Sequence, residues 1–236
     1  MALQRRRAVT VTTAVTDTEL TERPFSETLR ASTKEIHDRA HHSSYMDALL
    51  AGELSLAGYG QLAAQYFYIY DTLEQATDAM ANDPVGKGFA MDELRRVPAL
   101  VKDLEFLFGE GWRDRITPLP STRAYVERMR EVCFTWPGGF VAHHYTRYLG
   151  DLAGGQVVRS LLRKTYQVTA DGALFYDFDR VGNPHAFRKH YRALLNDAPW
   201  DTAERRRIID ETLLAFELNI AVLADLAKDL DAHRAA

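Results

Sequence analysis

Residues 145–156 read YTRYLGDLAGGQ. Helical periodicity continues on both sides of the three glycines, Gly150, Gly154 and Gly155. A glycine inside a helix costs about 1 kcal/mol relative to alanine, so such a cluster needs a reason. Gly150 and Gly154 lie four residues apart and share one helix face. The missing side chains allow either a ligand or a second helix to approach the backbone there.

The rest of the chain shows the same periodicity from Pro24 onward, without a series of strands. We expect Ser55 and Ser121 to begin helices, Pro98 to interrupt one, and the Pro-Gly-Gly run 137–139 to break another. The expected helices cover residues 26–42, 45–51, 55–81, 91–108, 121–136, 140–166, 184–195 and 202–230. The sequence therefore predicts an all-α, single-domain, multi-helical fold over residues 24–232.

Composition narrows the classes of function. A net charge of −4 over 236 residues, without a long run of like charge, argues against a nucleic-acid partner. No window approaches the roughly 18 consecutive apolar residues that a membrane span needs. Cys133 is the single cysteine, which excludes an intramolecular disulfide, a CxxCH attachment site and a thiolate-rich metal cluster. We therefore expect a cytoplasmic, reducing location and no membrane span.

The N-terminal residues 1–23 contain the basic run Arg5-Arg6-Arg7 and a stretch of threonine and valine. That stretch is too rich in hydroxyl groups for the apolar core of a secretory signal. We expect a disordered N-terminal tail here. A transit peptide, also rich in arginine and poor in acids at its start, is the weaker alternative.

The first expected helix carries a candidate ligand pair, His37 and Arg30. Seven residues make almost two turns, so both side chains lie on one face, about 10 Å apart along the axis. An imidazole is a good ligand for iron, and an arginine fork is a good partner for a carboxylate at the rim of a metal-centred cofactor. Taken alone, the helix is better explained by a partly buried histidine beside a surface arginine.

Two further clusters carry charge. Asp151 lies one turn after Arg147, so a salt link is expected to hold the carboxylate beside the glycine face, where ordered water can relay protons. Arg188 and Arg192 also lie four residues apart and form a second cationic site. Tight helix packing for the first cluster and a solvated basic face for the second are the structural alternatives.

At these residues the sequence resembles the haem oxygenase family. Residues 145–156 are similar to the distal-helix signature of that family, residues 33–37 look like its proximal helix, and the similarity extends from about Phe25 to Leu230. The resemblance implies a fold in which haem b, both cofactor and substrate, is sandwiched between the proximal and distal helices. It implies His37 as the axial iron ligand, Gly150 and Gly154 against the haem face, Asp151 with Arg147 and Tyr145 as a catalytic water network, and Arg30, Arg188 and Arg192 as propionate partners.

The implied reaction is oxidative cleavage of haem to biliverdin, ferrous iron and carbon monoxide with O2. No GxGxxG motif follows a strand, so electrons are expected from an external ferredoxin or NAD(P)H-dependent reductase. A non-catalytic haem sensor or storage protein would need His37 and the arginines but no proton relay. A related helical enzyme for a thiamin fragment would need a nucleophilic cysteine in the pocket, and Cys133 lies on a different expected helix.

Two positions depart from the family pattern. His41 stands where the family usually has a carboxylate that accepts the second imidazole proton of the ligand. Neutral His41 is able to accept that proton, but we expect His37 to be a weaker donor or to use water or a carbonyl instead. Ala153 replaces a common serine before the glycine pair, and we expect little effect on the reaction.

Overall fold

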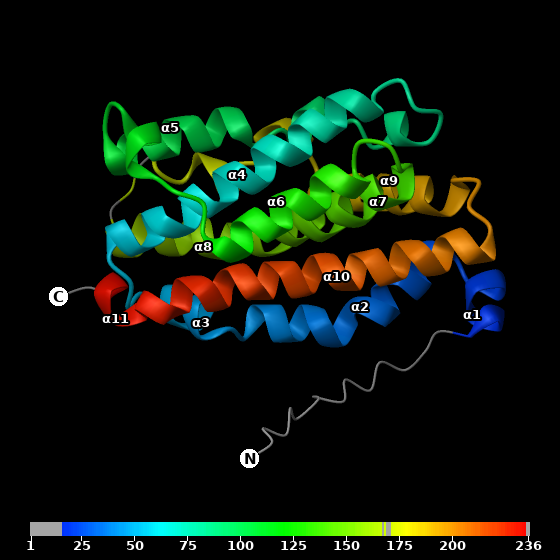
Figure 1. Ribbon diagram of the computed structural model, residues 1–236, viewed down its shortest axis with the longest axis horizontal. Coiled ribbons are helices and arrows are strands. Elements are labelled where there is room, and N and C mark those ends of the chain that lie inside the picture. The colour runs from blue at the N-terminus through cyan, green and yellow to red at the C-terminus, as the bar shows by residue number, and fades with distance from the viewer. Residues whose placement is uncertain (1–15, 167, 169–170, 235–236) are drawn as a thin grey trace, which may run out of the picture.

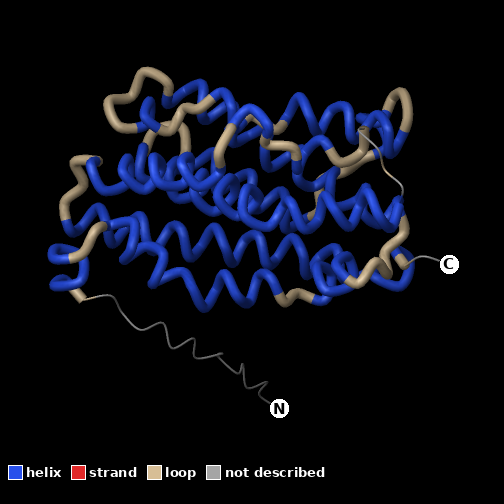
Figure 2. Tube along the Cα trace, turned by 180° about the vertical axis from the view of Figure 1, so that it is seen from behind, coloured by secondary structure: helices blue, strands red, loops and turns tan. Residues whose placement is uncertain are grey.

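The computed structural model describes residues 16–166, 168 and 171–234, and these are almost entirely helical (Figures 1 and 2). The described residues contain no strand, only an isolated bridge between Leu54 and Arg234. The helices are α1 (Asp17–Glu22), α2 (Phe25–His41), α3 (Ser44–Leu50), α4 (Leu56–Met80), α5 (Val97–Phe108), α6 (Pro120–Val132), α7 (Pro137–His144), α8 (Gly150–Tyr166), α9 (Pro184–Asp197), α10 (Thr202–Leu226) and α11 (Leu230–His233). The predicted all-α fold is confirmed.

Helix α10 is the central support of the arrangement. It runs along the molecule beside α2 and packs against α6 and α7 on its other side (Figure 1). Helix α4, equally long, packs against α5 and α6. Among the described residues, we find no helix with the length and apolar content needed to cross a bilayer.

Three helix starts differ from the prediction. Pro98 and Pro137 each lie in the first turn of a helix, α5 and α7, and do not interrupt or break one. A first-turn N–H has no partner within its helix, so proline loses nothing there and its fixed φ suits the helix. Ser55 begins α4 as expected, accepting the Gly58 N–H at 3.0 Å. Ser121 does not cap α6; its N–H and hydroxyl donate to Asp225 at 3.0 and 2.7 Å.

Part of the expected tail is ordered. Thr16 and Glu19 form a reciprocal capping box, and residues 17–22 form α1, so the prediction of disorder is wrong for that stretch. Leu20 is buried, and its carbonyl accepts a bond from Arg205 of α10 at 2.7 Å. This docking supplies the tertiary contact that a six-residue helix needs. Residues 1–15, and the transit-peptide alternative with them, lie outside the described residues.

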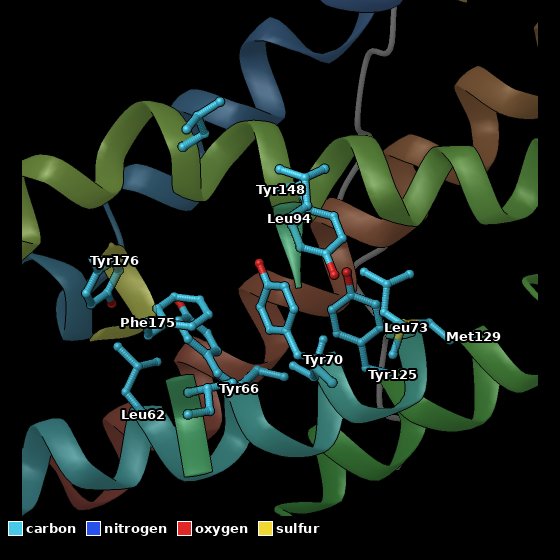
Figure 3. Packing of buried hydrophobic residues seen from close by; sticks show 14 of the residues in the cluster. Leu62, Tyr66, Tyr70, Leu73, Leu94, Tyr125, Met129, Tyr148, Phe175 and Tyr176 are labelled. Carbon is cyan, nitrogen blue, oxygen red and sulfur yellow. The ribbon is translucent and has the colours of Figure 1, made fainter. Parts of the chain in front are cut away.

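A π-helical turn, η4 (Tyr145–Leu149), joins α7 to α8. The expected helix over 140–166 is therefore observed as α7, a wider π-helical turn and α8 in succession. Such turns are rare and occur frequently at functional sites. The core below this turn is strongly aromatic: Tyr66 and Tyr70 of α4, Tyr125 of α6 and Tyr148 of η4 lie close together (Figure 3).

Asp103 of α5 fixes the segment that follows α8. Its fully buried carboxylate accepts the backbone N–H groups of Gly172, Leu174 and Phe175 at 2.7–2.9 Å. Burial raises the pKa of Asp103, and the three N–H groups offset part of that rise. The carboxylate thereby holds the segment whose Tyr176 packs against α8.

Replacing Asp103 with alanine should lower the free energy of unfolding by about 3 kcal/mol, because three buried donors lose a charged acceptor. Urea denaturation measures the change. Glu105→Ala, an exposed position on the same helix, is the matched control and should change stability by less than about 0.5 kcal/mol. Equal stabilities of the two variants would contradict this role for Asp103.

Candidate active site

A cavity of about 210 Å³ opens between α2 and the start of α8. Most of its walls come from α2, η4, α8 and α10, α3 and α4 also contribute to the lining, and most of its surface is apolar. The lining includes His37, Ala40, His41, Tyr66, Arg147, Gly150, Asp151, Gly154, Phe216 and Asn219. The cavity thus brings the imidazole of His37 and the predicted glycine face to one space.

The three glycines of α8 have different structural roles. A Cβ built on Gly150 meets no heavy atom within 4 Å from other described segments, and one on Gly154 meets only His41 Cε1, at 3.6 Å. A Cβ on Gly155 would lie 2.8 Å from Cδ1 of the Tyr176 ring. Gly150 and Gly154 therefore present bare backbone to the cavity, whereas Gly155 allows close packing. Both explanations of the glycine cluster hold, each for different residues.

Arg147 and Asp151 form the predicted salt link, with Nη2 3.1 Å from Oδ2. Two residues that the sequence did not identify complete the pair. The Tyr70 hydroxyl donates to Asp151, and Arg147 Nη1 donates to Asn219 Oδ1 at 2.5 Å. The guanidinium also lies 4.5 Å from the centre of the Tyr66 ring. This charged pair is held from α4, η4, α8 and α10 together.

Burial raises the pKa of the Asp151 carboxyl, and the Arg147 charge and the Tyr70 hydrogen bond offset part of that rise. A buried carboxyl with a raised pKa in a cavity is a candidate for a functional role. Two buried atoms near this pair, Tyr125 Oη and Arg147 Nε, have no hydrogen-bond partner among the described residues. Buried polar atoms of this kind are suited to bind ordered water.

His37 lies on the opposite wall, with its side chain 44% exposed. Its Nδ1 is 3.4 Å from Asp38 Oδ1, and its Nε2 is 3.2 Å from Nε2 of His41. We expected His37 either to be a weaker hydrogen-bond donor or to use a water or a carbonyl in place of the usual carboxylate. The structure instead places the carboxylate of the next residue, Asp38, within reach of that nitrogen. His41 contacts the other nitrogen, on the cavity side.

The remaining predicted residues lie beside the cavity and not in its lining. Tyr145 is half-buried in η4; burial raises its pKa, while Thr33 and the charges of Arg30 and Arg192 lower it. Arg30 and Arg192 therefore share one neighbourhood although they come from α2 and α9. Arg188 lies one turn earlier on α9. The hydroxyl partner of Asp151 is Tyr70, so the catalytic role of Tyr145 stays a prediction without a contact to support it.

Cys133 does not line the cavity. It is fully buried, its thiol donates to the Gly139 carbonyl at 3.8 Å, and burial raises its pKa. A thiol in that state is a poor nucleophile. The cavity therefore lacks the cysteine that the thiamin-fragment alternative requires, as far as the described residues extend.

Fold and cavity together define a helical protein that encloses a ligand between two helices. The sequence profile described as "Heme oxygenase" matches residues 23–225. Heme oxygenase 1 of Gallus gallus is 38% identical over 207 residues, which are 86% of this chain and 70% of that protein. Heme oxygenase 1 of Synechocystis is 33% identical over 202 residues, 86% of this chain and 84% of that one. The chain belongs to the haem oxygenase family.

Solved structures agree. The crystal structure of heme oxygenase-1 from Synechocystis in complex with heme superposes with a TM-score of 0.82 at 31% identity, covering 89% of this chain and 97% of that one. Heme oxygenase-2 from the same organism, in complex with heme and NO, gives 0.84 at 33% identity, with 89% and 88% covered. A TenA homologue from P. horikoshii gives 0.65 at 16% identity, covering 87% of this chain and 99% of that one, which shows a common fold alone.

The glycine geometry predicts opposite effects for two alanine substitutions. Gly155→Ala should destabilise the protein by about 1–3 kcal/mol, because the Tyr176 ring has to move. Gly150→Ala should leave stability unchanged or raise it by up to about 1 kcal/mol, since the methyl group has space and alanine favours the helix. Urea denaturation of both variants checks this, and destabilisation by Gly150→Ala would contradict an open face at that position.

Proposed function

We propose that the cavity between α2 and α8 binds haem b and that the chain oxidises it with O2 to biliverdin, ferrous iron and carbon monoxide. One observation carries the proposal: an imidazole, His37, and a helix face without side chains, Gly150 and Gly154, line the same largely apolar cavity from different helices. Membership of the haem oxygenase family and the likeness to two structures that contain heme support it.

The side chains present suit a haem. Nε2 of His37 would hold the iron, and Asp38 would accept the proton on Nδ1 and so orient the ring. Gly150 and Gly154 would allow the porphyrin to approach the α8 backbone. The propionates would be held by the three arginines named for this role, Arg30, Arg188 and Arg192.

Bound haem supplies the site at which oxygen binds and is itself the molecule that is oxidised. Asp151, fixed by Arg147 and Tyr70, lies beside the bare helix face and would orient the ordered water that carries protons to it. The residues that α8 and η4 contribute to the lining include no imidazole, in the part of the chain that the structure describes. A strong acid-base catalyst of the peroxidase type is therefore not supplied from that wall. Tyr145 is proposed to assist from the side of the cavity.

The reaction also needs electrons, which we propose come from an external ferredoxin or NAD(P)H-dependent reductase in a reducing cytoplasm. The single cysteine is compatible with that compartment. Docking would be transient and guided by charge.

A haem sensor or storage protein would not need the buried pair. Removing Arg147 and Asp151 from water costs several kcal/mol, and passive binding of haem does not require this buried ion pair. Incubating the haem-loaded chain with ascorbate under oxygen separates the two functions. We expect the haem absorption to be replaced by that of biliverdin, with release of carbon monoxide. Haem that stays intact under these conditions and with reduced ferredoxin would overturn the enzyme function.

Asp151→Asn should still bind haem but form biliverdin at least about 100-fold more slowly, because proton delivery is lost. It should gain peroxidase activity toward a phenol with hydrogen peroxide. Product formation measured by absorbance and carbon monoxide release tests this, with Asp210→Asn on the exposed side of α10 as the matched control. Normal biliverdin formation by Asp151→Asn would remove Asp151 from the mechanism.

A further inference from the structure

His37 and His41 form a pair that the proposed reaction uses only in part. They are the two histidines of the chain that lie four residues apart, so they project from the same face of α2. Both line the cavity. Their ring centres are 4.4 Å apart and the planes are inclined at 56°, so the rings converge through their Nε2 atoms, 3.2 Å apart.

We propose that these two Nε2 atoms chelate a divalent transition-metal ion in the haem-free protein. With metal–nitrogen bonds of about 2.0–2.1 Å, two nitrogens on one ion lie about 2.9 Å apart at a right angle and about 3.4 Å apart at the tetrahedral angle. The observed 3.2 Å falls between these values. The spacing of the two nitrogens therefore matches that of two ligands on one ion.

The surroundings favour metal binding over an ordinary histidine pair. Asp38 lies 3.4 Å from Nδ1 of His37, and a proton held there leaves the lone pair of Nε2 free for a metal. The hydrogen bond between the two Nε2 atoms needs one proton, which moves to the other nitrogen of its ring or to water when the ion binds. Phe216 packs edge-on against His37, at 6.0 Å between ring centres, and limits its rotation.

The proposed site is open on its cavity side. The described residues contain no cluster of three or more histidine, cysteine, aspartate or glutamate side chains that would complete a closed metal site. Water would fill the other positions, as at metal sites that keep a ligand exchangeable. Imidazole ligands bind Cu²⁺, Ni²⁺ and Zn²⁺ more tightly than Fe²⁺. Zn²⁺, which has no redox chemistry, is the appropriate probe.

A consequence rests on the proposed function: the ion and haem iron would share Nε2 of His37, so their binding would be mutually exclusive. Haem-free protein in a metal-rich cell would hold an exchangeable ion that haem has to displace.

Isothermal titration of the haem-free full chain with Zn²⁺ tests the site. We expect one equivalent to bind, and His41→Ala to weaken binding at least about tenfold because one of two metal–nitrogen bonds is lost. His42→Ala, the adjacent exposed histidine, is the matched control and should bind as the wild type does. Circular dichroism confirms that the helices of each variant are intact.

Absence of stoichiometric Zn²⁺ binding by the wild type, or equal binding by His41→Ala, would overturn the proposal. Equal weakening by His42→Ala would also overturn it, by placing the ion elsewhere. A parallel haem titration keeps the two proposals distinct. Loss of Zn²⁺ binding in His41→Ala with haem uptake retained supports the metal site, whereas Zn²⁺ binding by a wild type that takes up no haem would overturn only the proposed function.

Discussion

The arrangement of the whole site depends on the buried salt link between Arg147 and Asp151. Two charges taken out of water cost several kcal/mol each unless their hydrogen-bonding capacity is met, and loss of one partner leaves an uncompensated charge. Tyr70 and Asn219 meet that need, and the Tyr66 ring lies against the guanidinium. The helices that carry these side chains, α4 and α10, are therefore required on both sides of η4 and α8.

The backbone of α8 next to this link is less stable than that of an ordinary helix and is open to the cavity. Gly150 and Gly154 weaken helix α8 at its first turn, immediately after a π-helical turn that α-helices rarely tolerate. The two glycines leave main chain uncovered toward the cavity that His37 also lines. Close packing returns one residue further along, where Gly155 leaves room for the Tyr176 ring. Asp103 holds the segment that carries this ring. The sequence departs from ordinary helix preferences at the residues that face the cavity. Ordinary close packing returns directly behind them.

The sequence predicts contacts between residues that are close along the chain better than contacts between residues that are far apart along it. Helical periodicity located the main helices, and the four-residue spacing of Arg147 and Asp151 predicted their link, because both are local properties. Tyr70 lies 81 residues from Asp151, and no local pattern marks its hydroxyl as the partner. The order of α1 was missed for the same reason, since α1 depends on its docking to α10. The prediction for Pro98 was wrong because a proline at a helix start and a proline that interrupts a helix give the same local sequence signal. The residues before Val97 do not continue the helix.

The roles of His37 and of the bare glycine face are tested most directly by one spectroscopic titration. Adding hemin to the haem-free chain should produce the absorption band of a histidine-ligated haem, saturating at one equivalent. In His37→Ala the band should change, and added imidazole should restore it. No stoichiometric uptake by the wild type, or an identical spectrum for His37→Ala without imidazole, would contradict a haem seated between α2 and α8.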